Sequence, residues 1–221
     1  LFDGGGQHLI AHGIASPRKA DTLAVDLKKI NAGYVVPFFL PVQTIMFNGL
    51  LSGQAQIAGA MKQPAIEAQV HVDSMGLNNC WFGDAEVDLH IYPKHHTNEG
   101  ILPPQLQFHA EVDRPTRHVV SLDGEAIFDG SGKWKLDMDA DSVPLAFVNH
   151  WTSSVLTDLD GNASGKVVVG GRKGLTYVLL RAVAQNGAFT LPWTGGRYII
   201  PNDSIVMDTT AIIFPEVHGQ D

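Results

Sequence analysis

The stretch Ser142–Gly171, SVPLAFVNHWTSSVLTDLDGNASGKVVVGG, decides how the rest of this sequence is interpreted. Its first half predicts a helix, because apolar side chains recur every three or four residues and form one stripe. The stripe consists of Leu145, Val148, Thr152, Val155 and Leu159. Ser142 can cap the first turn, Pro144 suits the first helical position, and Gly161 can end the helix. We expect a short strand at Lys166–Val169 and a glycine turn to follow.

The same construction occurs 112 residues earlier in the chain. Six identities share this register: Gly49, Ser52, Gly53, Gly59, Trp81 and Gly83 match Gly161, Ser164, Gly165, Gly171, Trp193 and Gly195. They predict an internal repeat, which is stronger evidence of architecture than a local motif. We therefore expect one repeat-built β domain over 1–221, with repeat 1 at about 5–118 and repeat 2 at about 119–221. The helical segment of the first copy, Asn31–Asn48, contains Pro37 and Pro41, so it should be shorter than the second.

Most of the remaining chain alternates between apolar and polar residues, as half-buried strands do. The clearest examples are Ile66–Val72, Ala85–Ile91 and Leu106–Val112, and Asp129–Gly132 predicts a hairpin turn before Lys133–Ala140. Tyr92–Pro104 is interpreted as a loop. Thr176–Ala184 is largely apolar on both faces, with Arg181 the exception, and should need cover on both. The fold class predicted is mainly β: an elongated, curved antiparallel sheet, shaped like a groove or taco, with a short helical segment in each repeat.

Composition narrows the possible functions. The formal charge of −8, with only 15 Lys and Arg, argues against nucleic acid as a partner. Charged residues make up 17%, below the roughly 25% of ordinary domains, so the faces of the sheet should be unusually neutral. The single cysteine, Cys80, excludes an internal disulfide and a cysteine-based zinc site. No run approaches the ~20 apolar residues of a membrane span, and we interpret the sequence as a segment of a longer protein.

No motif predicts an enzyme, a metal or a cofactor. Six of the ten histidines lie in one central stretch (His71, His90, His95, His96, His109 and His118), but they occupy polar strand positions or a loop. Ser164 lies in a glycine-flanked turn whose spacing does not fit a nucleophile elbow, and Ser52 repeats it, which favours a role in turn geometry. The solvent-exposed face of one predicted strand carries Asp137, Asp139 and Asp141, which alternate with apolar residues. These aspartates lack the glycine that a calcium loop requires.

The sequence resembles the TamB family of the AsmA-like superfamily, translocation and assembly module proteins, in the form found in Bacteroidetes-type bacteria. The resemblance rests on 48–53 (NGLLSG) with its following strand and Pro64, on 141–145 (DSVPL), on Gly161–Gly171 and on 191–196 (LPWTGG). It spans roughly residues 5–215. It implies a periplasmic segment of an envelope protein that is anchored in the inner membrane by a part of the chain not present here. No catalytic residues follow from it, because the family has none.

The resemblance further implies an apolar β-groove that conducts phospholipid acyl chains between membranes and helps to assemble outer-membrane proteins with a BamA-like barrel partner. A groove of this kind needs a continuously apolar lining without charges. The expected lining residues are Ile66, Val70, Val72, Leu89, Leu106, Phe108, Val178 and Leu180. The alternative is a structural or adhesive β-repeat module whose face is packed shut by the helices. A weaker third option is a periplasmic hydrolase or carbohydrate binder that uses Trp81, Trp193 and the histidines.

Overall fold

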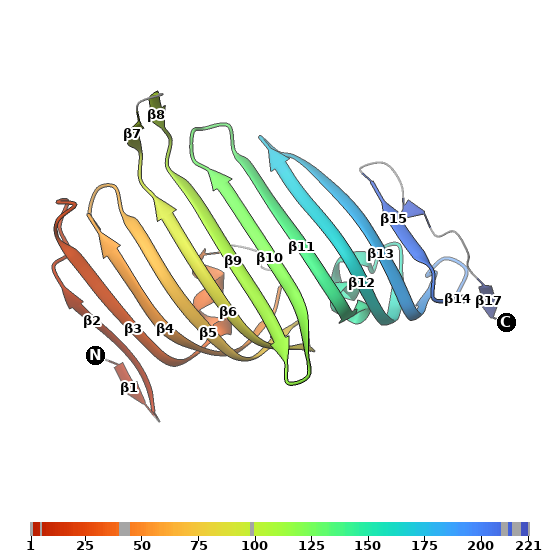
Figure 1. Cartoon of the computed structure of the whole chain (residues 1–221). Helices are drawn as coiled ribbons and strands as arrows, with labels where there is room; N and C mark the ends of the chain where they lie inside the picture. The colour runs from red at the N-terminus through yellow and green to blue at the C-terminus, as the bar shows by residue number, and fades with distance from the viewer. Residues whose placement is uncertain are drawn as a thin grey trace.

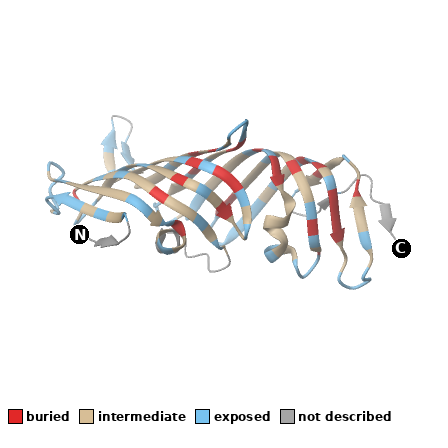
Figure 2. Cartoon of the chain, turned by 90° about the horizontal axis from the view of Figure 1, so that it is seen from below, coloured by how far each residue is buried: buried red, intermediate tan, exposed pale blue. Residues whose placement is uncertain are grey.

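The computed structural model describes residues 2–4, 6–39, 45–97, 100–208, 212–213 and 218–220. These residues form one 15-stranded antiparallel sheet that is curved and not closed, with two short helical segments beneath its arch (Figures 1 and 2). The predicted fold class is therefore confirmed. Strands that follow one another in sequence pair along almost the whole sheet, so the chain is a meander, and a separate two-stranded arm interrupts it once.

The first part of the sheet runs through β1 Phe2–Gly4, β2 Gln7–Gly13, β3 Thr22–Asn31, β4 Phe47–Ala58, β5 Ala65–Leu77 and β6 Cys80–Tyr92. Helix α1, Ala32–Phe39, lies between β3 and β4. The arm consists of β7 His95–Thr97 and β8 Gly100–Leu102. The segment expected to be a loop, Tyr92–Pro104, therefore contains a small hairpin.

The second part runs through β9 Gln105–Arg114, β10 Arg117–Ile127, β11 Lys133–Pro144, β12 Thr157–Arg172, β13 Leu175–Thr190, β14 Arg197–Ile200, β15 Ser204–Met207, β16 Ile212–Ile213 and β17 His218–Gln220. The 3₁₀ helix η1, Leu145–Val148, continues into α2, Asn149–Thr152, between β11 and β12. As predicted, Asp129–Gly132 separates two paired strands, β10 and β11.

The predicted helix of Ser142–Gly171 is wrong in its extent. Ser142 belongs to β11 rather than capping a helix, and Gly161 lies inside β12 with a φ of 89°. The register of β12 against β13 shifts at Asp160, so Gly161 supplies the left-handed residue of a β-bulge instead of a helix end. The predicted glycine turn at Gly170-Gly171 is also part of β12. The end of the helix was misplaced at Gly161 because a glycine with positive φ fits a β-bulge as well as it fits a helix terminus.

The two copies agree in backbone detail around these bulges. Gly49 and Gly161 both have positive φ at a register shift, and the Ser52 and Ser164 hydroxyls each accept the N–H of a left-handed residue on the preceding strand. In the first copy the donor is Lys29, at 3.1 Å, and in the second it is Ser142, at 2.8 Å. Each of these left-handed residues lies three positions before its helical segment.

The agreement ends after the fifth and thirteenth strands. Two residues, Asn78 and Asn79, connect β5 to β6, whereas six residues separate β13 from β14. Trp81 consequently lies in β6 and Trp193 in the turn after β13, so the expected equivalence of the two tryptophans is wrong. The expectation of a longer second helix is also wrong, because α1 has eight residues and the second helical segment, four in η1 and four in α2, is no longer than that. Pro41 lies outside the described residues.

Candidate functional site: the apolar inner face of the sheet

We call the face against which the helical segments pack the inner face. Strand residues alternate between the two faces of a sheet, so the pairing register fixes which side chains share a row on this face. The row nearest the helices contains Leu51, Val72, Ala85, Val112, Val120 and Ala140. Three further rows lie along the strands away from the helices and pass through Val70, Ala68 and Ile66 of β5.

These four rows carry no charged side chain from β3 to β13. The row through Val70 contains Val87, Ala110, Leu122, Met138, Val167 and Leu180, and the row through Ala68 contains Leu89, Phe108, Gly124, Leu136, Val169 and Val178. The outermost row contains Ile57, Ile66, Ile91, Leu106, Ala126 and Trp134. Thr176, at the end of this row, adds the one hydroxyl.

The helical segments cover one end of this face. Ala32 of α1 is buried in a cluster with Leu51, Val72 and Phe82, and Phe147 of η1 packs edge-on against Phe82 with ring centroids 5.4 Å apart. We call this the covered end. The Asn78 side chain donates to the Phe147 carbonyl oxygen at 2.9 Å, which joins the β5–β6 turn to η1.

A second cluster lies beneath η1 and packs Leu156 and Leu159 against Ala184 and Ile200. The Asn149 side chain holds this part of the chain in place through two hydrogen bonds to the backbone of Leu159, at 2.8 and 3.1 Å. Leu159 was expected on the helical stripe, but it belongs to β12, where it is buried.

The rows farther from the helices are only partly buried, and we call this the open end. Ile66, Ile91, Leu106 and Phe108 are all half-buried there, whereas Val72 and Val112 at the covered end are 6% and 3% exposed. Two aromatic rings lie over glycines of the neighbouring strand: Phe108 occupies the space where a Cβ on Gly124 would stand. Trp134, which is 37% exposed, does the same at Gly171.

All eight residues expected to line a groove lie on the inner face. Seven of them (Ile66, Val70, Leu89, Leu106, Phe108, Val178 and Leu180) are half-buried. Val72 is buried in the cluster under α1, so it is part of the core rather than of an accessible lining. The sequence pattern did not single out Trp134, although it follows the same alternation with Leu136 and Met138.

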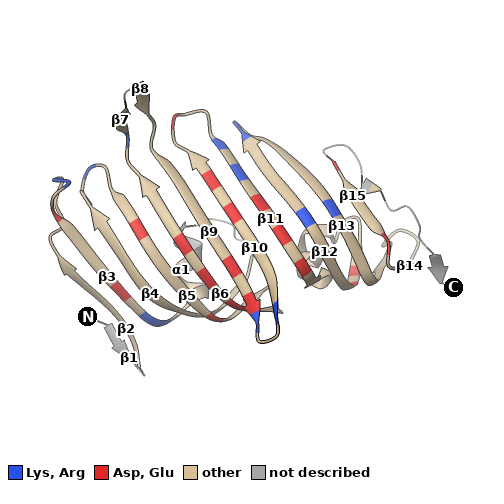
Figure 3. Cartoon of the chain, in the orientation of Figure 1, with Lys and Arg blue, Asp and Glu red and all other residues tan. Residues whose placement is uncertain are grey.

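The outer face is polar over most of its width, as Figure 3 shows for Asp and Glu. Acidic residues stand directly opposite each other on neighbouring strands: Asp84 faces Asp113, and Glu86 faces Glu111. Like charges in this position are destabilising. Histidines lie among them, at 71, 109 and 118.

Each of these three imidazoles has a carboxylate near both ring nitrogens. His109 Nδ1 is 2.8 Å from Asp123 and its Nε2 is 3.0 Å from Glu111. His118 contacts Asp113 and Glu111 at 2.9 and 3.1 Å. A neutral imidazole has one N–H, so only the protonated ring can donate to both neighbours. The described residues contain no group of histidines, cysteines and carboxylates arranged to hold a metal ion.

The pKa values of two histidines follow from these contacts. The hydrogen bond to Asp123 is the main cause that raises the pKa of His109. Burial acts to lower the pKa of His71, but hydrogen bonds to Glu86 and Asp73, at 2.7 and 3.2 Å, together raise it. His71 and His109 therefore keep their proton to a higher pH than a free imidazole does, and in that form they offset part of the negative charge of their neighbours.

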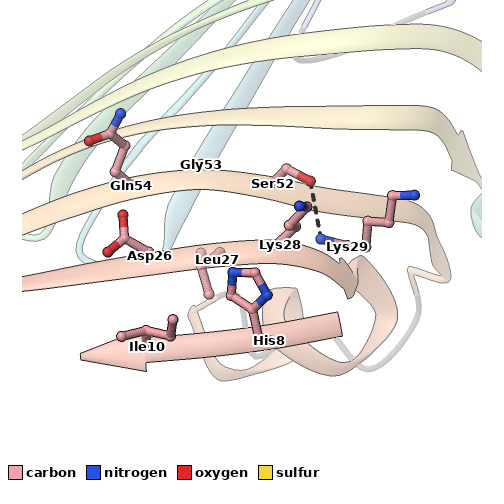
Figure 4. A pocket seen from close by; sticks show the side chains of 9 residues that line it. All are labelled: His8, Ile10, Asp26, Leu27, Lys28, Lys29, Ser52, Gly53 and Gln54. Carbon is pink, nitrogen blue, oxygen red and sulfur yellow. Dashed lines mark hydrogen bonds between the residues drawn. The ribbon is translucent and has the colours of Figure 1, made fainter. Parts of the chain in front are cut away.

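The outer face also contains a shallow hollow of about 460 Å³ between β2, β3 and β4 (Figure 4). Asp26, Lys28, Gln54 and His8 line it together with Ile10 and Leu27, so it combines charged and apolar groups. Ser52 also lines it, and its hydroxyl accepts the Lys29 N–H, drawn as a dashed line in Figure 4. Because Ser164 accepts an N–H in the same way in the second copy, bulge geometry accounts for both serines.

Two expectations were that both faces of Thr176–Ala184 are covered and that Trp81 and Trp193 occupy equivalent positions, and the structure agrees with neither. Leu179 and Val183 on the outer face of β13 are 47% and 45% exposed, so β13 is not covered on both sides. Trp81 and Trp193 are separated in the sheet by β9 to β12. Trp81 instead lies under the guanidinium of Arg114, 5.0 Å from its ring centroid.

No protein-family profile, curated protein or solved structure matches this chain. None of the helices among the described residues has the length and hydropathy needed to cross a bilayer. The site must therefore be interpreted from its own chemistry: a wide, charge-free apolar face, covered at one end and half-buried at the other.

Proposed function

We propose that this chain is a segment of a periplasmic envelope protein that resembles TamB, and that its inner face holds phospholipid acyl chains. In this role the segment contributes to phospholipid transport between membranes, to outer-membrane protein assembly with a BamA-like barrel, or to both. It acts as a scaffold and not as an enzyme. The observation that supports the proposal is the open end of the inner face, where half-buried Ile66, Leu106 and Phe108 lie among charge-free rows.

The dimensions of the face suit an acyl chain. Ile66 and Val72 lie six positions apart on β5, which corresponds to about 20 Å along an extended strand. An acyl chain in one leaflet spans about half of a hydrocarbon core that is ~30 Å thick. Each methylene that leaves water for such a lining gains about 0.8 kcal/mol. A charge on this lining would remove that gain locally.

The alternative function, a closed structural or adhesive module, requires the helices to pack the inner face shut. In the described residues, α1 lies against the row of Leu51 and Val72. The rows of Ile66 and Phe108 lie farther along the strands, beyond that cluster. The open end is thus the part of the molecule in which the two functions make different predictions.

The test is to purify the chain without delipidating detergent and to quantify bound phospholipid by mass spectrometry. We expect lipid to accompany the wild-type chain, and Phe108→Asp to remain folded by circular dichroism while losing most of it. His109→Asp, on the same strand but the outer face, is the matched control and should keep its lipid. A Phe108→Asp chain that stays folded and keeps its lipid would contradict the proposal.

A further inference from the structure

The turns at the open end of the sheet form a row along one margin of the molecule, at the top of Figure 1. Because the chain is a meander, alternate turns return to the same end. The row consists of the turns after β2, β4, β10 and β12 together with the β7–β8 arm, which lie at 14–21, 59–64, 128–132, 173–174 and 93–104. We call this row the turn rim, and we include the strand residues Lys133, Arg172 and Leu175 that flank the last two turns.

Every turn of the rim presents a large apolar side chain to solvent. These side chains are Ile14 (60% exposed), Met61 (72%), Ile101 (54%), Phe128 (56%) and Leu175 (78%). Single exposed apolar residues are ordinary on protein surfaces, but turns normally favour glycine, asparagine and aspartate. Five consecutive apolar tips along one edge indicate a surface that contacts an apolar phase.

The rim is also basic, although the whole chain is acidic. It contains seven exposed basic residues: Arg18, Lys19, Lys62, Lys94, Lys133, Arg172 and Lys173. Its acidic residues in the sequence are Asp21, Glu99 and Asp129, which gives a balance of +4 where the whole chain carries −8. Figure 3 shows basic positions at the tips of these hairpins, further basic positions on the strands and at the opposite end, and most acidic positions along the strands.

We propose that the turn rim binds the surface of an anionic lipid bilayer, with its apolar tips inserted and its basic residues near the headgroups. Exposed apolar groups beside Lys and Arg are the combination that lies in a membrane interface, and each basic residue near an anionic surface strengthens binding. The acidic outer face keeps the rest of the sheet away from the same surface. This surface is separate from the groove and does not require the inner face to hold lipid.

The opposite end of the sheet has exposed apolar residues with a mixed charge, because the basic residues Lys28, Lys29 and Arg117 lie there together with acidic ones. Trp193 is 65% exposed there and Trp81 is 51% exposed, and Asp84 and Asp113 lie on neighbouring strands at that end. Arg114, the basic residue over Trp81, donates its guanidinium N–H groups to the carbonyl oxygens of Trp81 and Phe82. The opposite end therefore provides a control with similar hydrophobicity and a different charge.

The test is flotation of the purified chain with vesicles of phosphatidylcholine alone or with one quarter phosphatidylglycerol. We expect at least about tenfold tighter binding to the anionic vesicles, falling as NaCl rises from 150 to 500 mM. The combined variant Arg172→Glu, Lys173→Glu and Leu175→Asp should bind at least about tenfold more weakly. All three residues are exposed at a hairpin tip, so the variant should fold, which circular dichroism verifies.

Two further variants make the outcomes decisive. Trp193→Asp should bind as the wild type does, and equal loss of binding in this variant and the rim variant would overturn the proposal. Phe108→Asp should still float with anionic vesicles, because Phe108 lies on the inner face and outside the turn rim. Loss of flotation in this variant would show that binding occurs through the groove and would contradict the proposal. A wild-type chain that does not distinguish the two vesicle types would also overturn it, and an acidic protein would then be the partner to test.

Discussion

The covered end and the open end of the inner face use the same strands and the same kinds of side chain, yet they differ in what lies above them. Val72 and Ile66 are both on β5 and both face inward, but Val72 is buried beneath α1 and Ile66 is half-buried. Alternation alone therefore identifies the face, and the position of a short helix decides which part of it is core. The stability of the fold should depend on one end and ligand binding on the other.

The largest effect should come from placing a charge at each end of β5. Val72→Asp puts an unpaired carboxylate into the cluster of Leu51 and Ala85, at a cost of several kcal/mol that is comparable with the whole stability of a domain. We expect this variant not to fold. Ile66→Asp should fold, because water reaches the open end. Thermal denaturation followed by circular dichroism compares them, and equal loss of structure in both would show that the face is one closed core.

Features that depend on residues close together in the sequence could be predicted from it, and features that depend on contacts between distant residues could not. The inner face follows from period-2 alternation in segments such as Leu106–Val112, so its membership could be predicted. The boundary between its ends could not, because α1 covers Val72 through a tertiary contact 40 residues away in sequence. Helix prediction failed at Gly161 because a bulge and a helix end require the same left-handed glycine.

Other features depend on the register of the sheet. Nothing in the local sequence shows that His109 lies beside Asp123 or that His118 lies beside Glu111, because β9–β10 pairing creates both contacts. The turn rim is similar: Arg18-Lys19 and Arg172-Lys173 are separate in sequence, and only the meander places them along one margin. Local patterns were sufficient for the faces and for the turn at Asp129–Gly132, but not for the turn expected at Gly170-Gly171. They were also insufficient for the neighbours that determine charge and cover.

An intermediate effect is expected from the serines that fix the bulges at the covered end. Ser164→Ala leaves the N–H of buried Ser142 without its acceptor, which should lower the free energy of unfolding by about 1–2 kcal/mol. Ser52→Ala should have a smaller effect, because the Lys29 N–H that it accepts is exposed. Ser131→Ala, in a turn at the open end, is the control and should change stability least. Urea denaturation measures all three, and a larger loss for Ser131→Ala would contradict the assignment of stability to the covered end.

The smallest effect concerns the outer face of the same strands. His71 and His109 have pKa values raised above the value of about 6.5 expected in the unfolded chain, so their contribution to stability is complete below that pH. It should disappear as the pH rises through the folded-state pKa values. Both side chains are more than one third exposed, so we expect the melting temperature to fall by only a few degrees between pH 6 and pH 8.5. The double variant His71→Gln and His109→Gln should lose this slope. Lipid bound per mole should not change over the same range, because the histidines and the inner face lie on opposite sides of the sheet. A loss of lipid that follows the melting temperature would show that the two faces are not independent.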